Sequence, residues 1–174
     1  MMLAARYTNQ PIAGWWLSEK FDGVRAFWDG SALRTRTWRE IVAPAWFIAA
    51  LPQGTALDGE LWGGRGSFQV ASELARFERA ADPVWHGMRL MVFDWPTTDA
   101  VPVETRLENA RKLTRGPHCE FVAQRRCRDL ADMHAEFAAV VAAGGEGLVL
   151  RRPGSFYEFG RSSCWLKVKP AGID

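Results

Sequence analysis

The chain has 174 residues and a formal net charge of +2, with 48% hydrophobic and 24% charged residues. This composition is typical of one soluble globular domain that is long enough to bury a core, and the small net charge does not by itself indicate nucleic acid as a partner. No apolar run approaches the length of a membrane span, and the N-terminus lacks the apolar segment of a secretory signal. We therefore expect no membrane association and a cytoplasmic location.

Cysteine and arginine usage limits the kinds of site that this protein can contain. The three cysteines form no Cys-x-x-Cys pair and lie near no histidine cluster, which argues against a zinc site and a disulfide framework. Most basic residues are arginine, because the lysines are only Lys20, Lys112, Lys167 and Lys169. Arginine favours planar partners such as phosphate. The sequence therefore indicates either an arginine-rich face for phosphates or the compositional bias of a GC-rich genome.

The first unusual stretch covers residues 18–27, in which Lys20 stands two residues before Asp22-Gly23 and five before Arg25. Apolar and aromatic residues at 15–17 and 24–28 predict a strand on each side. A lysine that is partly removed from water and flanked by arginine has its ammonium form disfavoured, which makes the free amine available as a nucleophile. The alternative is a surface hairpin in which Asp22-Gly23 form the turn and both cations are solvated.

A hairpin is predicted next along the chain. Asp29-Gly30 is a turn signal, and residues 32–37 then read as the returning strand. Side chains repeat every two residues along a strand, so Arg34 and Arg36 are predicted to share one face. Pro44 suits the first turn of a short helix over residues 45–51.

Residues 55–62 form the second unusual stretch. Their alternation predicts a strand with Asp58 and Glu60 on one face. Two carboxylates there repel each other unless they bind a cation or a hydroxyl-rich ligand. The glycine run at 63–66 lacks the lysine that closes a phosphate-binding loop. Ser67 is predicted to cap a helix over residues 68–80.

The second half of the chain alternates strands and helices. Strands are predicted at 88–95, 121–124, 146–152 and 164–170, and helices at 104–114 and 129–143, the latter closed by Gly144-Gly145. The last strand places Lys167 and Lys169 on the same face. The predicted fold class is α+β, with antiparallel sheets flanked by helices.

Five elements stand out in this order: Lys20-x-Asp22-Gly23-x-Arg25, Asp58-Gly59-Glu60, Phe93-Asp94, Glu146-Gly147 and Lys167-x-Lys169. The set resembles the motifs of the covalent nucleotidyltransferase superfamily, which comprises ATP-dependent DNA ligases, RNA ligases and mRNA capping enzymes. The text around the first two elements is most similar to small accessory DNA ligases of bacteria. The resemblance covers nearly the whole chain and implies one nucleotidyltransferase (ATP-grasp-like) adenylation domain over residues 1–174.

The resemblance implies a catalytic role for four cations. Lys20 would attack the α-phosphate of ATP and carry AMP covalently, which divides a difficult reaction into two steps. Arg25, Lys167 and Lys169 would favour the neutral amine and neutralise charge on the phosphates. The backbone near Ser18 and Glu19 would contact the edge of the base.

The remaining implied contacts to ATP and metal come from four further side chains. Glu60 would accept hydrogen bonds from the ribose hydroxyls and serve as a metal ligand, and Phe93 would stack on the adenine. Glu146 would help to hold Mg²⁺, an ion that prefers oxygen ligands. Arg36 would contact phosphate or the end of a DNA nick. Taken singly, Glu60 and Glu146 are also consistent with surface acids, and Phe93 with a core residue. Lys167 and Lys169 are consistent with a solvated strand face. Asp58 is predicted to pair with a structural cation or with a bound metal.

One departure from the family concerns the residues after Lys169, where ligases continue into an oligonucleotide-binding (OB-fold) barrel and only five residues remain. We therefore expect an adenylation domain without the OB-fold, a monomer that acts on nicked duplex DNA in replication, repair or recombination, with the barrel or another DNA-binding partner supplied separately. The alternatives are an RNA ligase, a capping-type nucleotidyltransferase, or a non-catalytic module that binds nucleotide or DNA.

Overall fold

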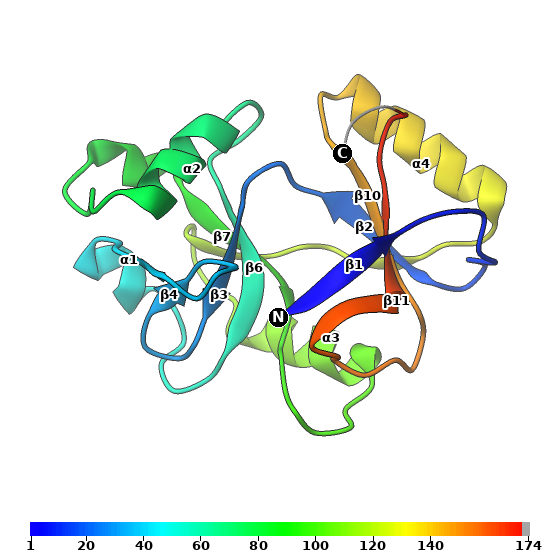
Figure 1. Ribbon diagram of the computed structural model, residues 1–174, viewed down its shortest axis with the longest axis horizontal. Helices are drawn as coiled ribbons and strands as arrows, with labels where there is room; N and C mark the ends of the chain where they lie inside the picture. Colours follow the sequence, from blue (N-terminus) through cyan, green and yellow to red (C-terminus); the bar gives the residue numbers. More distant parts are fainter. Residues whose placement is uncertain (172–174) are drawn as a thin grey trace. The chain divides into compact units, whose positions relative to one another are not determined.

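The computed structural model describes residues 1–171, and these form two compact units (Figure 1). Unit 1 contains Met1–Phe21, Thr98–Thr105 and the chain from Ala123 onward, and unit 2 contains Asp22–Thr97 and Arg106–Val122. The chain passes from unit 1 to unit 2 between Phe21 and Asp22. The first sequence motif is therefore shared, with Lys20 in unit 1 and Arg25 in unit 2.

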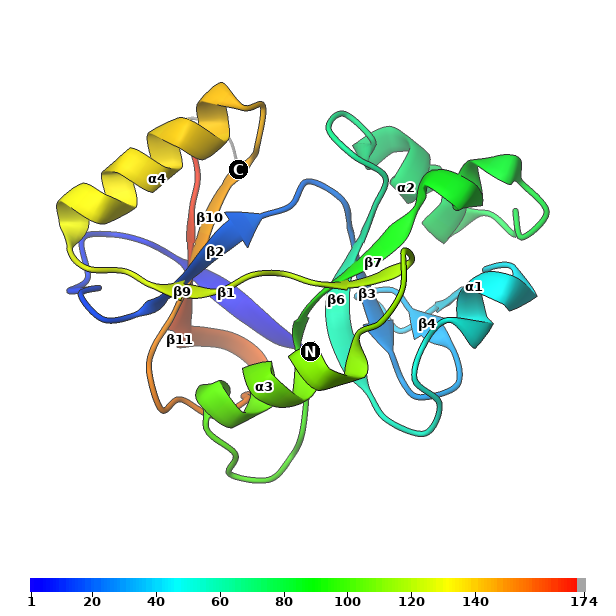
Figure 2. The ribbon, with the colours of Figure 1, turned by 180° about the vertical axis from the view of Figure 1, so that it is seen from behind.

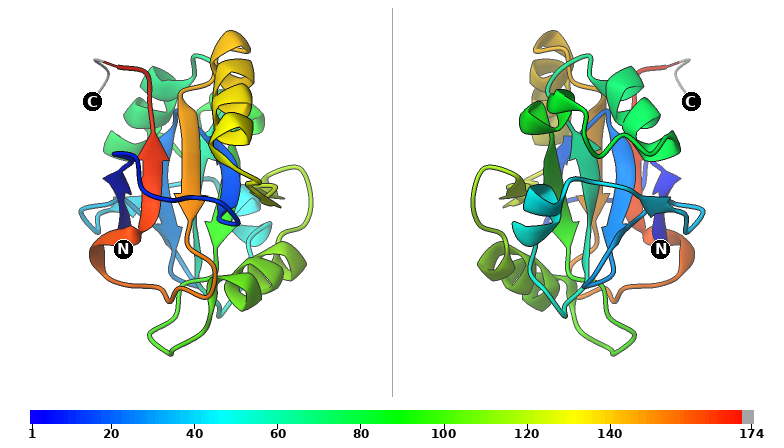
Figure 3. Two further views of the ribbon diagram at one scale, coloured as in Figure 1. Left: turned by 90° about the vertical axis from the view of Figure 1, so that its right-hand side faces the viewer. Right: turned by 90° about the vertical axis from the view of Figure 1, so that its left-hand side faces the viewer.

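Unit 1 is built on a five-stranded sheet in the order β1-β11-β10-β2-β9. Its core lies between this sheet and α4, and contains Leu17, Leu148, Leu150, Leu166 and Met133. Figure 3 shows α4 running along one face of the sheet. The elements are β1 (Met2–Arg6), β2 (Trp16–Lys20), β9 (Arg125–Arg126), α4 (Leu130–Ala142), β10 (Gly147–Arg151) and β11 (Gly160–Val168).

Strand alternation in unit 1 separates a core face from a second face. Leu17, Leu148 and Leu166 point toward α4, so their neighbours point the other way. Pairing places Gly147 opposite Lys20 in the register of β2 and β10, and Val149 opposite Lys167 in that of β10 and β11. Lys20 and Lys167 therefore share the face of the sheet that α4 does not cover.

Unit 2 is built on a six-stranded sheet in the order β5-β4-β3-β6-β7-β8. Every second side chain of β3, β6 and β7 enters its core, among them Ala26, Trp28, Leu57, Leu61 and Leu90. The elements are β3 (Val24–Trp28), β4 (Leu33–Arg34), β5 (Glu40–Ile41), α1 (Ala45–Ala49), β6 (Leu57–Trp62), α2 (Phe68–Arg76), the 3₁₀ helix η1 (Pro83–Gly87), β7 (Arg89–Asp94) and β8 (Cys119–Phe121).

Helix α3 (Val103–Leu113) begins in unit 1 and continues in unit 2 (Figure 2). Glu104 in its first turn accepts hydrogen bonds from the indole of Trp16 (2.9 Å) and from the backbone N–H of Gly154 (3.1 Å), both in unit 1. Arg106 pairs with Asp94, and both of these residues belong to unit 2.

The α+β class and most predicted elements are confirmed, including the two long helices and the strands that carry the motifs. The sheets are mixed rather than wholly antiparallel, because β1 pairs with β11 and β7 with β8 in parallel. The first strand, β5, β9 and η1 were not predicted. No helix among residues 1–171 is long and apolar enough to cross a bilayer.

Several element boundaries were wrong. β8 ends at Phe121, where a strand over residues 121–124 was predicted, and the last strand spans Gly160–Val168 and not residues 164–170. The returning strand ends at Arg34, because residues 35–39 form a tight turn in which the N–H of Thr35 donates to Arg39 O (2.7 Å) and that of Trp38 to Thr35 O (2.9 Å). Arg36 therefore lies in this turn and does not share a strand face with Arg34. Helix α2 ends at Arg76, because the next residue is extended.

Candidate active site

A cluster of two lysines and one carboxylate lies in unit 1. Lys20 Nζ lies 2.6 Å from Glu146 Oε2, and Lys169 Nζ lies 2.6 Å from Glu146 Oε1. Lys20 is the last residue of β2, Glu146 immediately precedes β10, and Lys169 follows β11, so the antiparallel register of three strands brings the groups together. The sequence predicted each of these residues, and the structure shows that they meet.

Glu146 is a charged carboxylate in a partly enclosed place. Its side chain is 14% exposed and that of Lys20 is 26% exposed. Burial raises the pKa of Glu146, but hydrogen bonds from Lys169 and Lys20 outweigh it and hold the pKa below the ordinary value of 4.5. The cluster therefore combines one acid and two cations that all remain within reach of a ligand.

Gly147 lets β10 approach the end of β11 closely. Its φ is +153°, and a Cβ atom built there would meet the carbonyl oxygen of Val168 well inside 3.0 Å, a distance that real Cβ atoms do not reach. Only glycine fits this position without displacing the backbone that leads into Lys169. The close approach of β10 to the end of β11 therefore explains why a glycine follows Glu146.

Lys167 and Ser18 lie on the same face of the sheet as Lys20. Ser18 is opposite Val149, which is in turn opposite Lys167. The hydroxyl oxygen of Ser18 is buried and has no hydrogen-bond partner among residues 1–171. Sequence analysis considered only the backbone here, although strand alternation with Lys20 indicates that the Ser18 side chain shares this face.

Glu19 points to the other face of β2. Its Oε1 lies close to Gly145 at the end of α4, since a Cβ built on that glycine would be 3.1 Å away. The structure therefore does not bring the Glu19 side chain to Lys20. A contact from Glu19 to the base would have to come from its backbone.

In unit 2, Arg25 is held by a carboxylate and an aromatic ring. Its Nε and Nη2 lie 2.6 and 2.7 Å from the two oxygens of Asp58, and its guanidinium lies 5.0 Å from the centre of the Phe93 ring. Asp58 is fully buried. Of the two partners that the sequence left open for Asp58, the structure supplies a side-chain cation. Glu60 lies opposite Arg25 in the register of β3 and β6.

A bulge sets the position of Phe93. Val92 pairs with Gly59 and Asp94 with Asp58, so Phe93 is the extra residue of β7. Such bulges re-aim a side chain and bend the strand locally. The sequence identified Phe93 but carried no sign of the bulge.

A second buried ion pair was missed by the sequence analysis. Arg106 Nε donates to Asp94 Oδ1 at 2.9 Å, and both residues are almost completely buried. Asp94 ends β7 directly after Phe93, so this pair fixes the end of the strand that carries the ring. An acid that ends an apolar strand is a weak signal for such a pair.

The sequence also predicted metal ligands. Within residues 1–171 no three His, Cys, Asp or Glu side chains lie close enough together to hold a metal ion. Glu146 offers two carboxylate oxygens, each now accepting from a lysine. This donor set suits Mg²⁺, which binds few protein oxygens and takes its other ligands from water and phosphate.

These features define an α+β domain that carries a lysine–carboxylate cluster, and solved structures of ATP-dependent DNA ligases share its fold. A solved structure from a structure–function study of Lig E DNA ligases matches with a TM-score of 0.87 and 37% identity over 97% of this chain and 68% of that one. A Chlorella virus DNA ligase-adenylate structure matches with a TM-score of 0.80 over 97% of this chain and 66% of its own; at 21% identity it shows the fold alone.

Sequence comparison gives the family. The sequence model of the family described as "ATP dependent DNA ligase domain" matches residues 1–169, and the chain belongs to this family. A DNA ligase of Haemophilus influenzae is 36% identical over 173 residues, which is 98% of this chain and 63% of that relative. The chain thus spans a little under two thirds of the length of this curated relative.

Proposed function

We propose that this chain is the adenylation domain of an ATP-dependent DNA ligase and that Lys20 is its nucleophile. A bond forms between Lys20 Nζ and the α-phosphorus of ATP while the bond to the bridging oxygen breaks, and pyrophosphate leaves with the electron pair. AMP is then passed from Lys20 to the 5′-phosphate of a DNA nick. The observation that carries the proposal is the pairing of Lys20 and Lys169 with one carboxylate, each at 2.6 Å.

The groups around Lys20 have separate roles in this proposal. The amine must give up a proton before it attacks, so its ion pair with Glu146 must loosen when the nucleotide binds. Lys169 and Lys167 neutralise charge on the phosphates as pyrophosphate leaves. Mg²⁺, when bound, supplies further neutralisation of the phosphates, and Glu146 and Glu60 are the carboxylates proposed to contact it.

The residues of unit 2 serve the nucleoside in the same proposal. Phe93 stacks on adenine, and Glu60 accepts hydrogen bonds from the ribose hydroxyls. Arg25, which Asp58 holds through two of its nitrogens, contacts phosphate. Arg36 contacts phosphate or the nick end.

The test is the intact mass of the protein before and after incubation with Mg²⁺ and ATP. We expect a gain of one AMP in the wild type and no gain in Lys20→Ala. Lys112→Ala is the matched control, because Lys112 is an exposed lysine of α3 that pairs with Glu108 at 3.4 Å; this variant should gain AMP normally. An adduct that persists in Lys20→Ala would refute the assignment.

Two substrate comparisons separate the neighbouring functions. Loading with GTP in place of ATP would indicate a capping-type enzyme. Transfer of AMP to nicked RNA but not to nicked DNA would indicate an RNA ligase. Nucleotide binding without any adduct would leave a non-catalytic module.

A further inference from the structure

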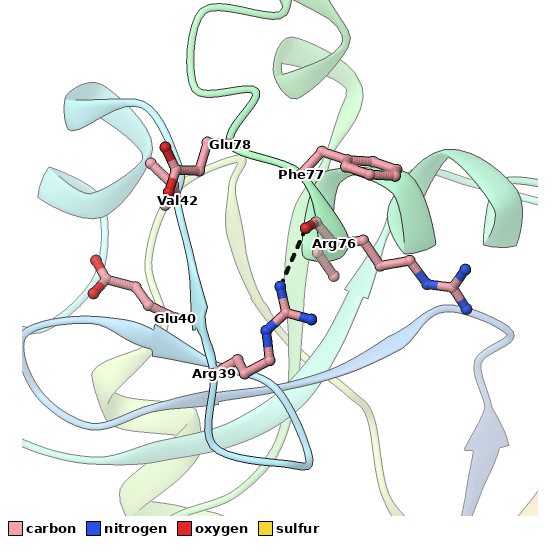
Figure 4. Close-up of a pocket in the computed structure, with 7 residues that line it drawn as sticks. Arg39, Glu40, Val42, Arg76, Phe77 and Glu78 are labelled. Atoms are coloured by element: carbon pink, nitrogen blue, oxygen red, sulfur yellow. Dashed lines mark hydrogen bonds between the residues drawn. The ribbon is translucent and has the colours of Figure 1, made fainter.

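An arginine–aromatic surface lies in unit 2, beside the turn that contains Arg36. It consists of Trp38 and Arg39 in the turn after β4 and of Arg76 and Phe77 at the end of α2. Arg39 Nη2 donates to the carbonyl oxygen of Arg76 at 3.2 Å, which joins the two segments (Figure 4). The surface borders a hollow of about 340 Å³ lined by Arg39, Glu40, Val42, Ala75, Arg76, Phe77 and Glu78.

The arginines of this surface form no ion pair among residues 1–171. Neither Arg39 nor Arg76 has a carboxylate partner among residues 1–171, and the same holds for Arg36 in the same turn. Six other arginines of unit 2 pair with carboxylates, namely Arg25, Arg34, Arg79, Arg89, Arg106 and Arg111. Positive charge left without a counter-ion at one place favours a polyanionic partner.

Two large aromatic rings lie among these arginines and face solvent. Trp38 is 54% exposed and Phe77 is 56% exposed. Trp38 adopts φ +67°, a backbone conformation that side chains of this kind rarely take, and its ring packs on Phe27 with 5.1 Å between centroids. Exposed aromatic faces beside arginines are the pattern of surfaces on which bases and sugars stack.

A purely structural role explains only part of this arrangement. The bond from Arg39 caps a terminal carbonyl of α2, and the charge of Arg76 in the last turn suits the helix dipole. Neither effect requires Trp38 and Phe77 to be exposed. The side chain of Arg76 makes no hydrogen bond or ion pair within the part of the chain that the structure describes.

We propose that this surface binds the sugar–phosphate backbone of duplex DNA beside the nick. Arg39 and Arg76 contact phosphates, and Trp38 and Phe77 pack against the deoxyribose rings. The proposal rests on the proposed function for its substrate and adds to it the place where the duplex is held. Glu78 lines the same hollow and opposes this binding by its charge.

The test is fluorescence anisotropy with a labelled nicked duplex, without ATP, over a series of salt concentrations. Each phosphate contact contributes about 0.9 to the slope of log K against log salt. We expect Arg76→Ala to reduce this slope by about 0.9 and Arg39→Ala/Arg76→Ala by about 1.8. Arg115→Ala is the matched control, because Arg115 is an exposed arginine after α3, and it should keep the wild-type slope.

Two further variants distinguish a loss of DNA contacts from damage to the fold. Glu78→Gln removes the opposing charge and should tighten binding severalfold, which a damaged fold cannot do. Trp38→Gly retains the backbone conformation and removes the ring, so it should weaken binding about tenfold with little change in slope. Circular dichroism melts of all variants verify that they are folded.

Adenylation separates failure of this proposal from failure of the proposed function. All four surface variants should gain AMP on Lys20 as the wild type does. If the wild type gains AMP but binds no nicked duplex at low salt, or if Arg76→Ala and Arg115→Ala give the same slope, the surface is not the DNA contact. If an acidic peptide instead of the duplex binds in a manner that depends on Arg76, the partner is a protein and the proposal is wrong.

Discussion

Replacement of Gly147 by alanine tests the register that assembles the Lys20 cluster. The new Cβ would overlap the carbonyl oxygen of Val168 and lie 3.1 Å from its carbonyl carbon, at a backbone φ of +153°. Relief of this overlap requires β10 and β11 to move apart or the chain before Lys169 to shift. Overpacking costs about 1–3 kcal/mol and backbone strain a similar amount, so we expect a loss of about 4 kcal/mol in the free energy of unfolding.

Gly154→Ala is the matched control for this substitution. Gly154 also has a positive φ, +72°, but no atom lies within 4 Å of a Cβ built there. It should therefore cost only the backbone term, about 1 kcal/mol. Urea unfolding measures both costs, and intact mass after incubation with ATP measures adenylation, which Gly147→Ala should impair even where the protein is folded. Equal destabilisation by the two substitutions would show that the close approach to Val168 does not matter.

Three further predictions concern charge and stacking. Asp58→Asn leaves the guanidinium of Arg25 without its carboxylate and should cost about 3 kcal/mol in urea unfolding; an unchanged midpoint would contradict a tight pair. Phe93→Leu removes the aromatic face and should raise the Kd for ATP about tenfold by calorimetry, with adenylation restored at saturating ATP. The pKa of Glu146 is lowered in the folded protein, so its contribution to stability is present above the unfolded value of 4.5 and is lost as the pH falls through the folded value. The stability difference between wild type and Glu146→Gln should therefore shrink from pH 7 to pH 3, and a difference that does not change with pH would refute it.

Strand alternation carried most of the fold prediction. Alternation predicted the strand that holds Glu60, and a run of apolar residues predicted the strand that holds Phe93. The strand before Lys20 was predicted only over residues 15–17, whereas β2 continues to Lys20 itself. The turn at residues 35–39 was not predictable, because Arg36 and Trp38 have no local composition that distinguishes a tight turn from a continuing strand. The positive φ of Trp38 is maintained by hydrogen bonds across the turn and by packing on Phe27, which are contacts that a local pattern does not contain.

Contacts within the candidate site depended on long-range register. Lys20 and Glu146 are 126 positions apart in the sequence, and only the pairing of β2 with β10 brings them together. Residue types suggested the chemistry of both, while the salt bridge between them required the fold. The bulge at Phe93 also depends on two strands at once, so neither strand alone could predict it.

Ion pairing in the structure divides the acids of the motifs into two groups. Asp58 and Asp94 are buried, and each forms an ion pair inside unit 2. Asp58 pairs with Arg25, and Asp94 pairs with Arg106. Glu146 differs because both of its partners are lysines that the proposed chemistry needs. Its charge holds Lys20 and Lys169 in place in the structure, and the same pairing must be given up by Lys20 before its amine can attack. A carboxylate that must change partners during the reaction is a better candidate for contact with Mg²⁺ than one already committed to a buried arginine.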